Sequence, residues 1–138
     1  FRNFRKIRER IEPACELGFS YLKLGQPSST LSGGESQRLK LAPLLGRKNL
    51  ENVLIIMDEP TTGLHFEDVS ALIRVVRRLV DRGSTIVIIE HNFDIIASSD
   101  WIIDIGPGAA DEGGNLLYQG PVRSGLGITT SPTLSRLS

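Results

Sequence analysis

Two adjacent carboxylates, Asp58 and Glu59, have the types and position to do chemistry in this 138-residue chain. They follow the apolar run Val53–Met57, and carboxylates placed after a buried strand cost free energy unless they hold a cation or a proton. Asp58 could bind Mg²⁺, directly or through water, because this cation prefers carboxylate oxygens. Glu59 could act as the general base that orients and deprotonates a water molecule. Most Asp-Glu pairs are ordinary solvated strand ends, but the Pro-Thr-Thr-Gly at 60–63 favours a functional site.

A second candidate site is the sequence Leu-Ser-Gly-Gly-Glu at residues 31–35. Ser32 followed three residues later by Glu35 is a capping box, which predicts that a helix begins here. The two glycines leave backbone N–H groups open to close approach, and the helix dipole adds partial positive charge, so the segment suits a phosphate-sized anion. Alone, the sequence indicates only a plain N-cap. Combined with the downstream Asp-Glu pair, it predicts an anion site made of Ser32, Gly33, Gly34, Glu35 and Gln37.

Polar residues also follow the next apolar run, Thr85–Ile89, where Glu90 and His91 stand. Parallel strands place their carboxyl ends at one edge of a sheet, where α/β proteins bind ligands. We therefore expect His91 to lie beside the Asp-Glu pair, where it could contact a terminal phosphate or the catalytic water. An isolated histidine is more often a hydrogen-bonded structural residue, and this is our interpretation of the other one, His65, at the start of a helix.

A phosphate-cradling loop is absent from the sequence. Such a loop needs the pattern G-x-x-x-x-G-K-[ST]. No lysine of the chain follows a glycine. We therefore expect the chain to lack a complete nucleotide-binding site of its own.

A strand–helix–strand unit must position these residues. The runs 53–57 and 85–89 are short, apolar and β-branched, which predicts two strands of a parallel sheet, buried on both faces. Residues 66–82 carry apolar side chains at helical spacing, and Gly83 is a suitable C-terminal stop. A βαβ crossover of this kind makes the two strands parallel.

The remaining predicted elements are described by their residue ranges. A helix is expected over residues 1–18, with Pro13 able to end it early, and Pro43 should end or kink the helix that follows Ser32. Further strands are expected at 101–105 and 116–118, the latter entered from a turn at 113–115. The Ser, Thr and Gly content beyond residue 123 predicts a domain over 1–123 and a poorly ordered tail over 124–138.

Composition excludes several classes of protein. With 40% hydrophobic residues and zero net charge, the chain is not disordered as a whole. Its longest apolar run falls far below the ~18 residues of a membrane span, so no membrane role is expected. The single cysteine, Cys15, cannot form an internal disulfide, and together with the lack of a signal segment it predicts a cytoplasmic protein. The first residue is Phe1 rather than Met, which leads us to expect a piece of a longer protein.

The first ten residues carry five basic side chains against one acidic side chain. Such a stretch could contact nucleic acid. Because the chain as a whole has no excess of positive charge, a solvated helix face is the favoured interpretation.

The order of these motifs resembles that of the ATP-binding cassette ATPases. Residues 31–35 look like the signature motif of that superfamily, and 53–59 look like its Walker B strand, with Glu59 in the position of the catalytic base. His91 looks like the switch histidine. The resemblance implies an α/β fold with a mainly parallel sheet, like that of P-loop NTPases, represented here by its C-terminal portion without the phosphate-binding loop.

The chain is more specifically similar to the UvrA family, the damage-sensing ATPases of bacterial nucleotide excision repair. The similarity covers about residues 15–122 and is carried by segments 21–27, 58–65, 90–92 and 100–107. The Thr-Thr-Gly-Leu-His at 61–65 is the most specific of these, since transporter ATPases usually have Ser-Ala-Leu-Asp nearby. The resemblance is to the C-terminal part of the second cassette, and Pro43 departs from the uninterrupted helix of the family.

The resemblance implies that a complete ATP site forms between two cassettes. Ser32 and Gly34 would act on ATP held by a second cassette or homodimer partner, while Asp58, Glu59 and His91 would serve Mg²⁺ and ATP held by the same cassette. A full-length protein would hydrolyse ATP and bind damaged DNA and repair partner proteins. The alternatives are a non-catalytic dimerisation or interaction module, and a cassette of a transporter- or drug-resistance-linked UvrA-like paralogue.

Overall fold

The computed structural model describes residues 3–106, 114–126, 128 and 131–137. Contacts between residues divide the chain into two compact units, Phe1–Glu90 and His91–Ser138.

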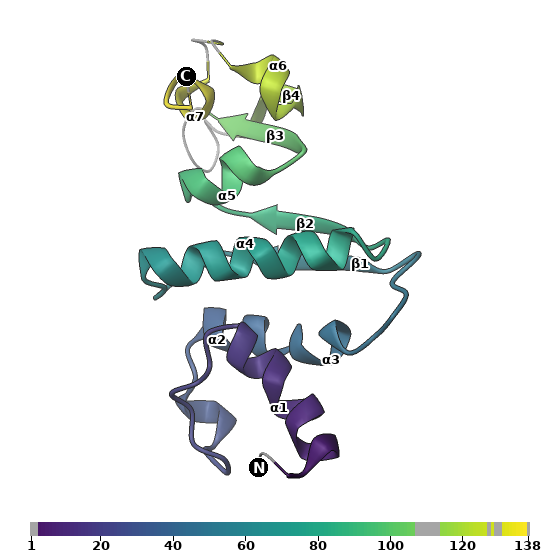
Figure 1. Cartoon of the computed structure of the whole chain (residues 1–138). Helices are drawn as coiled ribbons and strands as arrows, with labels where there is room; N and C mark the ends of the chain where they lie inside the picture. The colour runs from purple at the N-terminus through teal and green to yellow at the C-terminus, as the bar shows by residue number, and fades with distance from the viewer. Residues whose placement is uncertain (1–2, 107–113, 127, 129–130, 138) are drawn as a thin grey trace. The chain divides into compact units, whose positions relative to one another are not determined.

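The first unit begins with short helices (Figure 1). These are α1 (Arg5–Glu16), a 3₁₀ turn at Ser28–Thr30, α2 (Gly33–Leu39) and α3 (Ala42–Leu45). The helix predicted near the N-terminus is confirmed, and Pro13 lies inside its last turn without ending it. Pro43 ends the helix that follows Ser32, as predicted, and lies in the first turn of α3, where its missing N–H leaves no helical bond unmade.

The predicted βαβ unit is confirmed. Strand β1 (Leu54–Asp58) pairs in parallel with β2 (Thr85–Ile89), and Asp58 lies opposite Ile89. The connection is α4 (Phe66–Val80), which lies along the two strands in Figure 1. Its apolar stripe forms much of the core, with four buried side chains: Val69, Leu72, Val75 and Leu79.

The expectation that both strands are buried on both faces is wrong. Met57 is 2% exposed, but its neighbour Ile56 is 66% exposed, and Leu54, Val87 and Ile89 are exposed as well. Successive side chains of a strand point to opposite faces of the sheet. In residues 3–90, α4 covers one face of the β1–β2 pair. Every second side chain of each apolar run points to the other face and is exposed, although the run is typical of a strand buried on both faces.

The second unit contains a pair of antiparallel strands. Its elements are α5 (Phe93–Ser98), β3 (Trp101–Gly106), β4 (Asn115–Pro121), α6 (Val122–Gly125) and α7 (Pro132–Ser135). Strands β3 and β4 were both predicted, and they form a sheet separate from that of β1 and β2. Gly113 of the predicted turn and Pro107 lie outside the described residues. The α/β fold class is confirmed.

The segment after residue 123 includes the helix α7, which packs within the second unit. Leu134 of α7 is fully buried with Ile102 and Val122. Ser131 accepts a hydrogen bond from the backbone N–H of Leu134 and donates one to the carboxylate of Asp104. The expected boundary between 1–123 and a poorly ordered tail stays a prediction, because residues 127, 129–130 and 138 are not described. Among the described helices, none has the length and apolar character needed to cross a membrane.

Candidate functional site

The backbone fixes the Asp-Glu pair at the end of β1. Asp58 is the last residue of the strand, and the N–H of Glu59 extends the pairing by donating to the carbonyl of Ile89 at 2.9 Å. Glu59 has a φ of +44°, in the left-handed region that residues with a Cβ rarely adopt. Both acids are exposed. The strand end therefore presents two carboxylates to solvent, one of them on strained backbone.

The turn after the two acids is tied to the end of β2. The Glu90 carboxylate accepts hydrogen bonds from the backbone N–H of Thr61, at 2.9 Å, and from its hydroxyl. The N–H of Thr62 donates to the Glu59 carbonyl at 3.1 Å. The prediction that Glu90 lies at the same sheet edge as the two acids is thus correct. Its bonds to Thr61 were not predicted, because nothing in the sequence indicates that two residues 29 positions apart are paired.

The capping box at the start of α2 is present. The N–H of Glu35 donates to Ser32 Oγ at 3.2 Å, and the N–H of Ser32 donates to Glu35 Oε2 at 2.7 Å. The hydroxyl of Tyr21 donates to the other carboxylate oxygen. This bond, followed by the bond from the Ser32 N–H, lowers the pKa of Glu35, and it raises the pKa of Tyr21. The carboxylate of Glu35 is therefore held within its own helix cap.

The lowered pKa of Glu35 predicts a pH-dependent contribution to stability. A carboxyl whose pKa is lower in the folded state stabilises the fold above its unfolded pKa, near 4.3, and loses this contribution as the pH falls through the folded value. Glu35→Gln keeps a capping amide but no charge at the helix start, so it should lower the free energy of unfolding at pH 7 by about 0.3–0.5 kcal/mol. Denaturant unfolding should show this difference shrinking towards pH 3, and a difference independent of pH would contradict the assignment.

The two glycines of the motif differ in their surroundings. Gly34 is buried, and a Cβ placed on it would lie 3.2 Å from the Thr62 carbonyl oxygen and 3.5 Å from that of Glu59. A Cβ placed on Gly33 would have no atom within 4 Å. The close approach of α2 to the turn after β1 therefore depends on Gly34, while Gly33 is open to solvent.

Two side chains of α2 bind the backbone on both sides of Glu59. The Gln37 amide donates to the Asp58 carbonyl at 2.9 Å and accepts from the Asp58 N–H at 3.0 Å. The Arg38 guanidinium donates to the Pro60 carbonyl. Arg38 is 3% exposed, its guanidinium carbon lies 5.7 Å from the centre of the Phe19 ring, and burial lowers its pKa. The structure thus brings the candidate anion segment and the acid pair together in one unit.

A polar hollow of about 430 Å³ borders this arrangement. Its lining includes Tyr21, Glu35, Arg38, His65 and Asp68, so the histidine interpreted as structural faces a polar surface. In the described parts of the chain, no three His, Cys, Asp or Glu side chains are grouped closely enough to hold a metal. Asp58 could supply one oxygen to a hydrated Mg²⁺, which usually keeps several waters.

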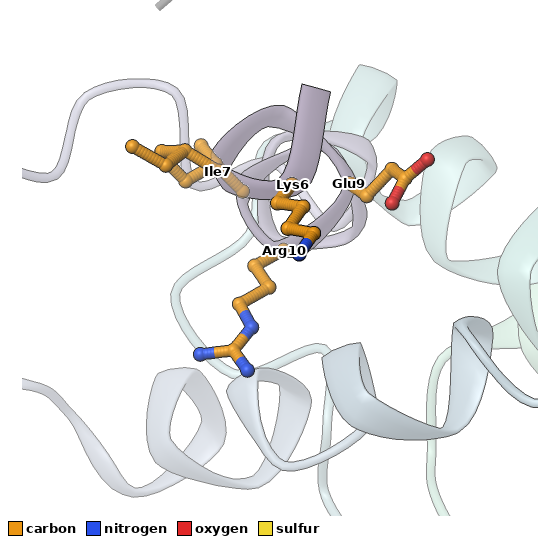
Figure 2. Close-up of a pocket in the computed structure, with 5 residues that line it drawn as sticks. Lys6, Ile7, Glu9 and Arg10 are labelled. Atoms are coloured by element: carbon orange, nitrogen blue, oxygen red, sulfur yellow. The ribbon is translucent and has the colours of Figure 1, made fainter. Parts of the chain in front are cut away.

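The basic N-terminal stretch forms a solvated helix face, as the sequence favoured. Figure 2 shows Lys6, Ile7, Glu9 and Arg10 projecting from α1 in different directions around a surface hollow. Arg5 forms an i,i+4 ion pair with Glu9 at 2.7 Å, which raises its pKa. The hollow contains none of the predicted site residues.

His91 is the first residue of the second unit. Its predicted position beside Asp58 and Glu59 therefore stays a prediction. Glu90, directly before it in the chain, belongs to the first unit and reaches the turn after β1.

Comparison with known proteins identifies the relatives of the chain. UvrABC system protein A from Thermus thermophilus is 50% identical over 133 residues, which cover 96% of this chain and 14% of the relative. The protein of the same name from Aquifex aeolicus is 51% identical over 120 residues, covering 87% of this chain and 13% of the relative. The chain is homologous to a segment of UvrA. No family model matches it.

The fold agrees with this relationship to UvrA. The crystal structure of UvrA2 from Deinococcus radiodurans matches with a TM-score of 0.90 and 43% sequence identity. The match covers 99% of this chain and 17% of the UvrA2 chain. The sequence therefore spans about one seventh of the length of the UvrA relatives, and its helices and strands follow the UvrA2 fold.

Proposed function

We propose that this chain is the part of a UvrA-like ATP-binding cassette ATPase that supplies the signature segment and the catalytic acids, from the C-terminal part of the second cassette. The main support is the packing of α2 on the end of β1, where Gln37 binds the backbone of Asp58 and the space beside Gly34 is closed by the carbonyls of Glu59 and Thr62. The identity of about 50% to UvrA proteins over most of the chain adds to it.

In this proposal each residue has a defined task. Asp58 would hold Mg²⁺, directly or through water, and the bound ion would supply positive charge next to the phosphates of ATP. Glu59 accepts a proton from the attacking water. Ser32 and Gly34 act on ATP held by a second cassette, Glu35 keeps their helix cap in place, and His91 contacts the terminal phosphate.

The activity of the whole protein is part of the same proposal. A UvrA-like protein would hydrolyse ATP, dimerise, and recognise damaged DNA in nucleotide excision repair with its partner proteins in the cytoplasm. Hydrolysis that depends on Glu59 and responds to damaged DNA, measured on the full-length gene product that carries residues 1–138, would test it.

For the 138 residues alone, the missing phosphate loop favours a role in docking over catalysis. The chain lacks a glycine-lysine phosphate loop, so it would serve as a docking module that completes the ATP site of a partner cassette. We predict that the isolated chain binds Mg-ATP with a Kd no lower than about 1 mM. The chain lacks the loop whose N–H groups would bind most of the phosphate oxygens. Isothermal titration should show this, with circular dichroism to confirm the helices. Micromolar affinity would contradict the prediction.

A further inference from the structure

We propose that Gln37 is a positioning residue for Glu59, acting through the Asp58 peptide and not on the nucleotide. This inference rests on the proposed function, because it concerns the geometry of the proposed catalytic base. The sequence placed Gln37 among the anion-binding residues, and the structure gives it another task.

The Gln37 side chain binds Asp58 as a neighbouring strand would. Its Nε2 donates to the Asp58 carbonyl at 2.9 Å, and its Oε1 accepts from the Asp58 N–H at 3.0 Å. A primary amide that makes both bonds to one residue has its plane and its distance fixed. The half-buried amide is thus committed to the strand end, and its role towards a ligand is indirect.

Glu59 needs such support because its backbone is strained. A φ of +44° in a residue with a Cβ persists only where the surroundings hold it. Helix α2 holds the preceding residue through Gln37 and the following residue through Arg38, which donates to the Pro60 carbonyl. The Glu59 N–H is bound to Ile89 of β2. The residues on both sides of the proposed general base are therefore bound to a single helix.

The same helix begins with the signature segment. Gly34 lies about one turn before Gln37; Gln37 binds the strand end, and a Cβ on Gly34 would meet the carbonyls of the turn after it. A displacement of α2 when its start meets ATP on a partner cassette would move the Asp58 peptide with it. Gln37 thereby couples occupancy of the signature segment to the position of the general base.

The test is steady-state ATP hydrolysis by the full-length gene product carrying Gln37→Ala. Misplacing a catalytic group by about 1 Å can cost 10²-fold, so we expect kcat to fall by about 10- to 100-fold with KM for Mg-ATP changed less than about twofold. Hydrogen exchange should show faster deuterium uptake at the Asp58 amide, which loses its acceptor. Gln26→Ala is the matched control, because the Gln26 side chain donates to the Thr30 hydroxyl in an exposed loop; it should leave kcat unchanged.

Each outcome decides the proposal. A raised KM with unchanged kcat would make Gln37 a nucleotide contact, and unchanged kcat and exchange would remove any role; both overturn it. If Gln37→Ala does not fold, Gln37→Glu keeps the acceptor and loses the donor, and its kcat should lie between those of wild type and an inactive enzyme; wild-type kcat would overturn the proposal. Wild-type protein without ATPase activity, or Glu59→Gln with full activity, would instead refute the proposed function.

Discussion

Replacing Glu59 with glutamine should lower kcat for ATP hydrolysis by about 100- to 10,000-fold while Mg-ATP still binds. An amide has nearly the same shape as the carboxylate but cannot accept the proton of the attacking water, and general-base catalysis contributes effects of this size. The Glu59 side chain is exposed, so its charge contributes little to the fold, and the melting temperature should change little. Single-turnover hydrolysis and equilibrium binding of Mg-ATP by the full-length gene product would measure the two effects separately.

The matched control for this substitution is Glu67→Gln. Glu67 is an exposed acid in the first turn of α4, so the variant removes the same charge from the same unit without touching the end of β1. Its kcat should equal that of the wild type. Hydrolysis by Glu59→Gln at more than a tenth of the wild-type rate would contradict the assignment of the general base. Equal losses in both variants would trace the effect to net charge.

The βαβ unit was predictable because its evidence is local. Short β-branched runs before Asp58 and Glu90, with an apolar stripe at helical spacing between them, fix the types and order of the elements. Burial was not predictable in the same way. Whether Ile56 is covered depends on what lies over its face of the sheet, and an apolar run carries no information about that. Helix α5 was missed because six residues are too few to show a helical period.

In the candidate site, too, local features could be predicted and long-range contacts could not. The capping box joins Ser32 to Glu35, only three positions away, and is visible in the sequence. The bonds from Gln37 to Asp58 join residues 21 positions apart. From the sequence alone, an amide beside the signature segment could equally bind a ligand or the protein backbone. Long-range polar contacts of this kind are set by the packing of α2 on the strand end, so the acids could be predicted while the groups that orient them could not.

Replacing Gly34 with valine should both destabilise the protein and impair hydrolysis. The Cβ alone would lie 3.2 Å from the Thr62 carbonyl oxygen, and two further methyl groups would force α2 away from the turn. Overpacking of this kind costs about 1–3 kcal/mol, which exceeds the few tenths that valine gains over glycine in helix propensity. The Glu59 carbonyl lies on the same side, so the displaced turn should also lower kcat by about 10²-fold.

Gly33→Val separates packing from helix propensity, because a Cβ there meets no atom within 4 Å. Its free energy of unfolding should change by less than about 0.5 kcal/mol, while that of Gly34→Val falls, both measured by denaturant titration of the full-length gene product. Equal stability of the two variants would mean that α2 does not rest on the turn through Gly34. A stable Gly34→Val variant with wild-type hydrolysis would also remove the physical basis for coupling between the signature segment and Glu59, since that coupling requires the helix and the turn to stay in contact.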